Sequence, residues 1–232
     1  MKIESRIFGG KYFRPQPIIE IDEVQNKLIL ATPWGDSSFA EKSIAKINEY
    51  LQASSSEADV TQHLEYIEAL GPSVNRLRSA LLMVNEFLFA ENRKEIQGVV
   101  EVLILQQEAG SLSWVQVGFP NLLLVGKKSL QPFSLQMDLA EQFEMEAPLF
   151  NQALGLEKIC HVQCGSIRLQ PSASSTQLVL LSRSGIPVEF LQTAHLLQLD
   201  SAGSARNGLE LLSKKLVTDS DTKPFWLGLV QL

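Results

Sequence analysis

Two cysteines and a histidine lie close together in the second half of the sequence, in the segment KICHVQCG. Cys160, His161 and Cys164 offer thiolate and imidazole groups, which are the ligands that zinc prefers. A closed zinc site needs four ligands, but the chain has no second cysteine pair, and the other histidines, His63 and His195, lie within helical patterns. We therefore expect both cysteines to be inert, buried side chains of a strand, reduced rather than joined in a disulfide.

The charge and hydropathy of the chain exclude several classes of function. Its 232 residues carry 20 basic and 26 acidic side chains, a net charge of −6, and the basic ones are dispersed. This argues against a surface for nucleic acid or for an anionic membrane. The most apolar stretch, 112–125, is interrupted by Gln116 and Pro120, and the N-terminal MKIESRIFGGKYF lacks the apolar block of a secretory signal. We expect a soluble, cytoplasmic protein with neither nucleic-acid nor membrane partners.

The first part of the chain predicts a hairpin followed by a helix. IIEID (18–22) and KLILA (27–31) are typical of two short strands joined by a polar turn. A helix should begin near Ser38, because Ser38 and Glu41 have the spacing of a capping box and apolar residues then recur at helical steps.

Two further helices are expected after this one. Asp59 should cap a shorter helix that carries Ile67 and ends at Gly71-Pro72. The next helix has one apolar stripe, made of Leu77, Leu81, Val84 and Leu88.

The middle of the sequence predicts mainly strands. The segments with strand composition are 98–105, 112–118, 121–126, 158–164 and 177–182. Short connections such as Phe119-Pro120-Asn121 predict that neighbouring strands pair antiparallel. Several of the strands are apolar at successive positions, so both faces of the sheet should be covered. Helical patterns return at 187–199 and 205–217, and PFWLGLVQL closes the chain as a last strand.

These elements predict one domain over residues 1–232, since no repeat or linker divides the chain. Antiparallel strands that are apolar on both sides, together with amphipathic helices in two blocks, are satisfied when two sheets pack face to face and each outer face carries a helix pair. The expected fold class is α+β, a four-layer α/β/β/α sandwich of two antiparallel sheets.

The order of the elements resembles the metal-dependent protein phosphatases of the protein phosphatase 2C family, from about Arg14 to Leu232. Six segments in the family's order carry the resemblance: LILATPWGDSSFAEKSIAKINEYL, ALLMVNEFLFAEN, WVQVGFPNLLLVG, PLFNQALGL, LVLLSRSGIP and DSDTKPFWLGLV. The fifth, for example, is similar to the family's Leu-Leu-Cys-Ser-Asp-Gly-Leu. In the second, Val84 stands where alanine is usual.

The resemblance implies a specific chemistry. Members of the family hold two Mn or Mg ions with aspartates, and a bridging water attacks the phosphorus of a phosphoserine or phosphothreonine. Two hard cations in one pocket need several carboxylates to offset four positive charges. Arg14 matches the family's phosphate-contacting arginine.

The aspartates of the family are mostly absent from this chain. The positions that match them, or that flank them, hold Ile19, Thr32, Pro33, Phe119, Ser184 and Gly185. Pro33 stands at a loop glycine, and Gly185 keeps the glycine of the Ser-Asp-Gly motif. Asp219, in DSDT, is the only family aspartate retained. We therefore expect no catalytic residues and no bound cofactor in the vestigial cleft.

Each surviving residue also has an ordinary structural interpretation. Arg14 could be an ion-pairing residue at the surface or at the edge of the core, and Asp219 a turn residue. Asp36 could be a displaced metal ligand, although its place beside Ser38 is typical of a helix cap. Gly35, Gly118 and Gly185 are expected at turns that only glycine suits.

These observations predict a pseudophosphatase: a phosphatase fold without the dimetal centre, acting as a regulatory module on a protein partner. One alternative is a metal-dependent serine/threonine phosphatase with Mn or Mg in a rearranged site, whose carboxylates would be Glu20, Asp22, Asp36, Asp219 and Asp221. The other is a phospho-ligand sensor that uses Arg14.

The surface that would contact a partner is harder to place from the sequence. Trp226 and Phe225 could be aromatic anchors, but packing inside the last strand is the simpler expectation. Phe143 and Phe150 flank the acidic segment EQFEMEAPLF, which fits neither a strand nor a long helix, so they are better candidates for an exposed apolar patch.

Overall fold

The computed structural model describes residues 1–9, 12–56, 66–145, 147–169, 176–198, 205–217 and 223–232. The chain forms two compact units: the first unit is Met1–Gln16, Phe119–Asn151 and Ser172–Leu232, and the second unit is Pro17–Gly118 and Gln152–Pro171. Each unit contains one five-stranded antiparallel sheet. That the chain is one domain stays a prediction.

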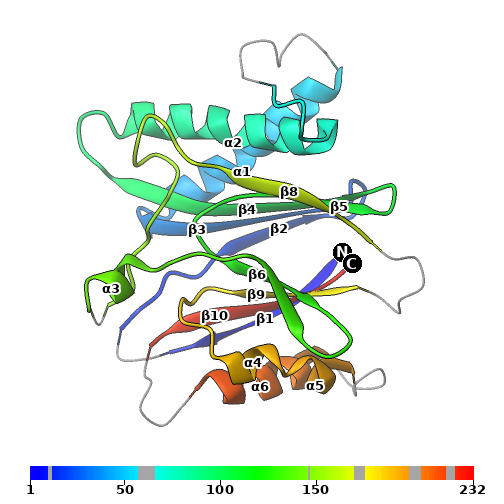
Figure 1. Ribbon diagram of the computed structural model, residues 1–232. Helices are drawn as coiled ribbons and strands as arrows, with labels where there is room; N and C mark the ends of the chain where they lie inside the picture. The colour runs from blue at the N-terminus through cyan, green and yellow to red at the C-terminus, as the bar shows by residue number, and fades with distance from the viewer. Residues whose placement is uncertain (10–11, 57–65, 146, 170–175, 199–204, 218–222) are drawn as a thin grey trace. The chain divides into compact units, whose positions relative to one another are not determined.

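The second unit is a sheet with two long helices against one face (Figure 1). Its strands, in sheet order, are β2 (Ile18–Asp22), β3 (Lys27–Gly35), β4 (Gly98–Glu108), β5 (Ser111–Val117) and β8 (Gln163–Arg168). The helices are α1 (Ser38–Ser56) and α2 (Pro72–Glu91). Their apolar stripes form the core of this unit with the sheet, and the predicted stripe of α2 is fully buried there.

The first unit has the same plan with shorter helices. Its strands, in sheet order, are β1 (Lys2–Phe8), β10 (Phe225–Gln231), β9 (Gln177–Leu181), β6 (Asn121–Val125) and β7 (Leu130–Ser134). The helices α4 (Val188–Leu191), α5 (Ala194–Gln198) and α6 (Ala205–Leu216) cover one face (Figure 1). A fourth, α3 (Leu139–Gln142), lies on the connection after β7. The core lies between the sheet and α4 to α6.

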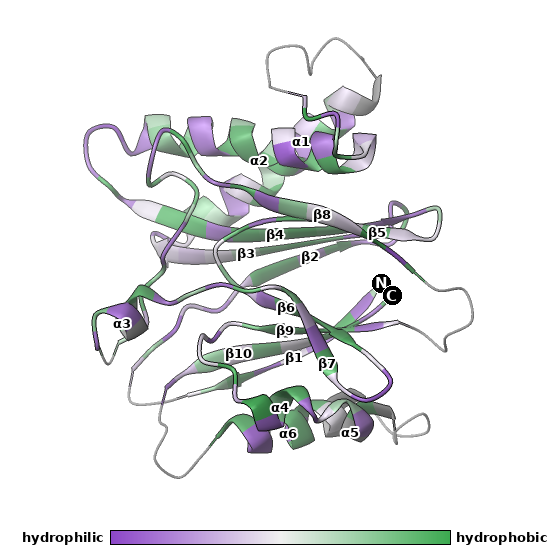
Figure 2. Ribbon diagram, in the orientation of Figure 1, coloured by the Kyte–Doolittle hydropathy of each residue, from purple (hydrophilic) through white to green (hydrophobic). Residues whose placement is uncertain are grey.

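Most of the predicted elements are confirmed. The hairpin over 18–31, the helix from Ser38, the helix with the Leu77 stripe, the central strands and the last strand all form. β4 is buried at nine successive positions, Glu101 and Gln106 among them, and β10 is buried at six, as their mainly apolar sequences predict (Figure 2). The pattern over 187–199 forms two short helices, α4 and α5, instead of one.

The predicted pairing across Phe119-Pro120-Asn121 is wrong. β5 lies between β4 and β8 in the second unit, whereas β6 lies between β9 and β7 in the first. Both edges of each strand are therefore occupied by other partners, and the short connection carries the chain from one sheet into the other. Connection length alone predicted a hairpin because it says nothing about which strand edges are still open.

Two boundaries also differ from the prediction. Gly71-Pro72 begins α2 instead of ending a helix, with Pro72 in the first turn, where proline's missing N–H costs nothing. Ile67 is not helical, and Asp59 lies outside the described residues. The strand expected at 158–164 is β8, which starts only at Gln163, where pairing with β5 begins. Cys160 therefore precedes the strand, and only Cys164 belongs to it.

Candidate functional site

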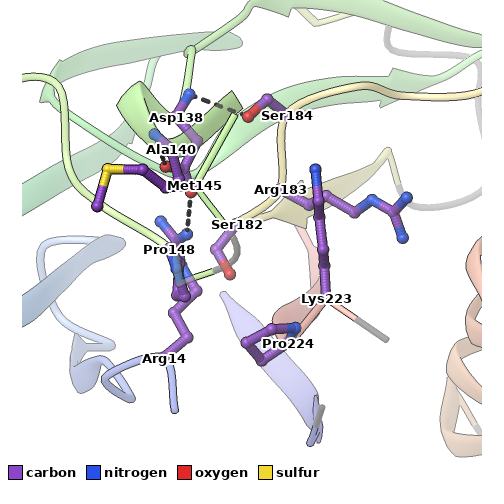
Figure 3. A pocket seen from close by; sticks show the side chains of 10 residues that line it. All are labelled: Arg14, Asp138, Ala140, Met145, Pro148, Ser182, Arg183, Ser184, Lys223 and Pro224. Atoms are coloured by element: carbon purple, nitrogen blue, oxygen red, sulfur yellow. Dashed lines mark hydrogen bonds and ion pairs between the residues drawn. The ribbon is translucent and has the colours of Figure 1, made fainter. Parts of the chain in front are cut away.

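Arg14 forms a buried ion pair in the first unit (Figure 3). One guanidinium nitrogen, Nη1, lies 3.0 Å from Oδ2 of Asp138, and the two side chains are 3% and 9% exposed. The guanidinium also lies over the ring of Phe119, 4.5 Å from its centre, in the geometry of a cation–π contact. The ion-pairing interpretation of Arg14 is thus confirmed, although the pair is in the interior.

Asp138 is the centre of this network, and the sequence analysis missed it. Its Oδ1 accepts hydrogen bonds from the backbone N–H groups of Ala140, at 2.9 Å, and Leu149, at 2.8 Å. Its own N–H donates to Oγ of Ser184, at 2.9 Å. Asp138 and Glu141 have the spacing of a helix cap, so the sequence carried a signal for its local role. Nothing in the sequence indicated its pairing with Arg14.

Ser182, Arg183 and Ser184 contribute the other wall of this network (Figure 3). The hydroxyl oxygen of Ser182 accepts the backbone N–H of Trp226, at 2.7 Å. Arg183 donates to the backbone oxygen of Leu216 at the end of α6, at 3.1 Å. Ser184, which the sequence matches to a family aspartate, accepts a hydrogen bond from the backbone N–H of Asp138, so its hydroxyl has a structural role.

A small hollow adjoins these residues. It is lined by Arg14, Asp138, Ala140, Met145, Pro148, Ser182, Arg183, Ser184, Lys223 and Pro224. Its volume is about 20 Å³, which is roughly the space needed for one water molecule. A phosphate group is larger than that, and Arg14 already faces a carboxylate. The hollow is therefore poorly suited to a phosphorylated ligand in this conformation.

Phe119 and Gly185 complete the predicted positions in the first unit. Phe119, which the sequence matches to a metal-binding aspartate of the family, is buried, and its ring lies beneath the Arg14 guanidinium. Gly185 adopts a positive φ of 64°, which agrees with a turn position that favours glycine.

Ile19, Thr32 and Pro33 lie on the first two strands of the second unit. Ile19 pairs with Leu30, and Pro33 pairs with Val100 of β4. Val100 exchanges both of its backbone hydrogen bonds with Leu154 on its other side. Pro33 therefore stands at a position where the ladder with β4 needs no N–H, which is why a strand tolerates it.

Thr32 stands directly across the ladder from a carboxylate, Glu101 of β4. Glu101 is fully buried, and its Oε2 accepts the indole N–H of Trp34 at 2.9 Å. It also packs against Gly118, where a Cβ would lie only 2.6 Å from Glu101 Cγ. Gly118 has a positive φ of 76°, so both conformation and close approach require glycine there. A single Glu inside an apolar strand was the unused sequence signal.

The carboxylates of the alternative metal site are engaged separately. Oδ1 of Asp36 accepts the N–H of Ser38 at 2.9 Å, a helix-entry contact that lowers the pKa of Asp36. Asp22 accepts the N–H groups of its own turn, the one from Gln25 having the largest effect in lowering its pKa. Glu20 accepts the side-chain amide of Asn48. Asp219 and Asp221 lie outside the described residues.

Apart from Asp219, which lies outside the described residues, the residues that the sequence matches to the family's ligand positions do not fit a pair of divalent ions. Mn and Mg need several oxygen ligands, with carboxylates to balance their charge, and an alkane, a phenyl ring and two neutral hydroxyls cannot supply these. Within the described part of the chain, no group of three or more His, Cys, Asp and Glu residues is arranged to hold a metal.

The two cysteines are poor nucleophiles. Burial raises the pKa of the Cys160 thiol to about 11, and burial also raises that of Cys164. Both thiols are half-buried and protonated at neutral pH, in agreement with the inert role expected of them. Among the described residues, no helix is both long and apolar enough to cross a membrane.

Comparisons with known proteins identify the fold. No protein-family model matches the sequence, and no curated protein matches it. PppA, a key regulatory component of T6SS in Pseudomonas aeruginosa, superposes with a TM-score of 0.63 at 15% identity, covering 100% of this chain and 97% of that chain. The serine/threonine phosphatase PstP/Ppp of Mycobacterium tuberculosis gives 0.63 at 13% identity, covering 100% and 98%.

A third similar structure is the PPM Ser-Thr phosphatase MsPP from Mycobacterium smegmatis, with a TM-score of 0.57 at 12% identity and coverage of 100% and 98%. Identities this low establish the fold and leave the activity open. The chain has the fold of the PPM-type serine/threonine phosphatases, which confirms both the expected α+β class and the resemblance found in the sequence.

Proposed function

We propose that this chain is a pseudophosphatase, a catalytically inactive protein phosphatase 2C-like domain that acts as a regulatory module by binding a protein partner. One observation carries the proposal: the positions that match the family's aspartates hold side chains with other uses. Ile19 is a strand residue opposite Leu30, Phe119 packs under Arg14, and Ser184 accepts a backbone hydrogen bond.

A regulatory role agrees with one of the similar structures. PppA is described as a regulatory component of a secretion system, so a protein of this fold can serve in regulation. The proposal includes a cytoplasmic location, no cofactor, and a protein as the partner. The net charge of −6 and its dispersed lysines and arginines support the exclusion of nucleic acid.

The two alternatives receive less support. A rearranged Mn or Mg site would need its five carboxylates to converge: Glu20, Asp22, Asp36, Asp219 and Asp221. The first three are each held by a different local hydrogen bond, and the last two lie outside the described residues. A phospho-ligand sensor would need the Arg14 guanidinium, which faces Asp138 in the interior. Releasing it would leave a buried carboxylate uncompensated, at a cost of several kcal/mol.

The test is an activity assay joined to a thermal melt. The full chain is incubated with a phosphoserine peptide and with p-nitrophenyl phosphate, in millimolar Mn or Mg, beside the PstP catalytic domain as a positive control. We expect no turnover and no metal-dependent rise in melting temperature. A metal present at a hundred times its dissociation constant would add about 2.7 kcal/mol of stability, which a melt resolves easily.

An Asp219→Ala variant provides the decisive control. Turnover by the wild-type chain that this variant loses would overturn the proposal and establish a rearranged site. Turnover that is unchanged in the variant and scales with the impurity of the preparation comes from a contaminating phosphatase. The assay is then repeated on purer protein, until it shows either turnover that depends on Asp219 or no turnover.

A further inference from the structure

The connection between β7 and α3 and the turn after α3 expose a cluster of large apolar side chains. We call residues 135–145 the Phe143 loop. Leu135 and Met137 are each 56% exposed, Phe143 is 64% exposed and Met145 is 45% exposed. Four such side chains within eleven residues make an apolar surface that water disfavours. Phe150, which the sequence analysis grouped with Phe143, is only half-buried and lies outside this cluster.

The backbone under these side chains is firmly held. The N–H of Gln136 donates to the side chain of Asn121, and Asp138 is fixed by Arg14 and Ser184. Leu139 donates to the backbone oxygen of Leu149 at 3.1 Å, which closes the base of the loop.

The turn after α3 is held in the same way. Phe143 donates to the backbone oxygen of Leu139 at 3.0 Å, and Met145 donates to that of Ala140 at 2.7 Å. The loop therefore presents its exposed apolar side chains from a fixed backbone, so little ordering entropy is lost when a partner binds.

The charge of the loop indicates the partner's chemistry. Between Lys128 and Asn151, the end of this stretch of the first unit, the sequence contains no Lys, Arg or His, but it contains Asp138, Glu141, Glu144 and Glu146. Asp138 is neutralised by Arg14. Glu144, next to Phe143, is exposed. A cationic partner gains attraction from this segment, and apolar contacts with Phe143 and the methionines would supply affinity.

We propose that the Phe143 loop is a docking surface for a basic amphipathic segment of a protein partner, one that places apolar side chains beside lysines or arginines. This inference rests on the proposed function, because it gives a chemistry to the partner of the inactive domain. Phe143 and Met137 are the apolar contacts, and Glu144 contributes the charge.

The test measures binding of a fluorescein-labelled peptide of leucine and lysine, designed as an amphipathic helix, to the full chain by fluorescence anisotropy. A matched peptide has glutamate in place of every lysine. We expect the basic peptide to bind, the acidic peptide not to bind, and the affinity to fall as salt is raised. The double variant Met137→Ser, Phe143→Ser should weaken binding about tenfold or more, as the loss of an interface anchor does.

Two further variants serve as controls. Val24→Ser changes an exposed apolar side chain of the second unit, 94% exposed, and should leave the affinity unchanged. Glu144→Gln should weaken binding and reduce its salt dependence. Circular dichroism melts of all variants show that the fold persists, which is expected because the changed side chains are exposed.

Three outcomes would overturn the inference: equal binding of both peptides, equal loss of affinity in the Val24→Ser variant, or no effect of the double variant. Sedimentation compares the molecular mass of the wild type with that of the double variant. If the wild type is an oligomer that the double variant cannot form, and the peptide does not dissociate it, the loop contacts a second copy of this chain instead. The phosphatase assay on the same preparations separates the two proposals. Turnover would overturn the proposal that the domain is inactive. If there is no turnover and the double variant binds the basic peptide as tightly as the wild type does, only the docking surface is overturned.

Discussion

The two units satisfy their buried carboxyl groups in different ways. In the second unit, Thr32 stands beside Glu101, whose carboxylate is fully buried and is satisfied by the indole of Trp34 two residues along the same strand as Thr32. In the first unit, Ser184 joins a network in which Arg14 and Asp138, 124 positions apart in sequence, neutralise each other. The buried Glu101 side chain thus accepts a hydrogen bond from the adjacent strand, whereas the Arg14–Asp138 ion pair joins segments that are distant in sequence.

The two units also differ in how their exposed apolar side chains are distributed along the sequence. The exposed apolar residues of the second unit are scattered: Ile21, Val24, Tyr66, Met83, Ile96 and Ile159. In the first unit, four are concentrated in the Phe143 loop, directly beside the Arg14–Asp138 pair. A buried charge pair that merely stabilises a fold need not lie beside an apolar surface. Here the pair fixes the backbone of the loop that carries the exposed side chains, which agrees with the docking surface proposed for the Phe143 loop.

The sharpest difference between the units should appear when Asp138 is changed to Ala. The variant removes the carboxylate that faces the buried Arg14 guanidinium, and losses of about 3–5 kcal/mol are typical of a broken buried pair. Urea denaturation measures the loss, and Asp22→Ala, which removes a partly exposed carboxylate of the second unit, is the control with a smaller effect. A loss below about 1 kcal/mol in Asp138→Ala would mean that the pair does not hold the first unit together.

A smaller effect is expected from Trp34→Phe in the second unit. The ring still packs, but the buried Glu101 carboxyl loses its indole donor, which should cost about 1–3 kcal/mol in the free energy of unfolding. Combining Trp34→Phe with Glu101→Met should recover part of the loss, because no buried carboxyl group then remains at position 101. If the double variant loses more free energy of unfolding than the two single variants lose together, the hydrogen bond is not what couples these residues.

Acid should reveal the contribution of Asp36. The fold lowers its pKa below the ordinary value of 3.8, so its stabilising effect is fully present above 3.8 and is lost as the pH falls through the lowered value. Stability of the wild type should therefore exceed that of Asp36→Ala at neutral pH, with the difference shrinking in acid. Urea midpoints measured between neutral pH and strong acid show this, and a difference that does not depend on pH would assign the effect to something other than the carboxylate.

The smallest effect belongs to the Phe143 loop. Met137→Ser and Phe143→Ser should each change the free energy of unfolding by no more than about 0.5 kcal/mol, because both side chains are already largely in water. Together with the large cost expected for Asp138→Ala, this would show that Asp138 stabilises the loop, whereas the exposed side chains of Met137 and Phe143 do not. A substantial destabilisation by Phe143→Ser would show that the ring packs against the protein in solution.

The elements with strong local periodicity were predictable from sequence, and those defined by distant partners were not. α1 and α2 carry long apolar stripes, so their sequences indicated them. β1 was missed because it is an edge strand with mixed burial, and β7 because it contains Pro132. The change of sheet at Phe119 depends on which strand edges are open, which a local pattern does not encode.

The same limit applied to the site. The absence of the family's aspartates could be read directly, because it depends only on residue types at matched positions. The contacts of these positions could not be predicted, since Arg14 meets Asp138 through the tertiary fold, and Thr32 meets Glu101 through the register of β3 and β4. Asp219 lies outside the described residues, so its role as the retained aspartate stays a prediction.

The register of β1 has a consequence for how the protein is made. β1 is an edge strand whose neighbour is β10, with Lys2 opposite Gln231, so β1 is synthesised well before the strand with which it pairs. The second unit, whose residues end with Pro171, can collapse while the remaining chain is still being synthesised. During that interval the waiting strand is open to unwanted pairing, and shielding by a chaperone would matter most for this segment.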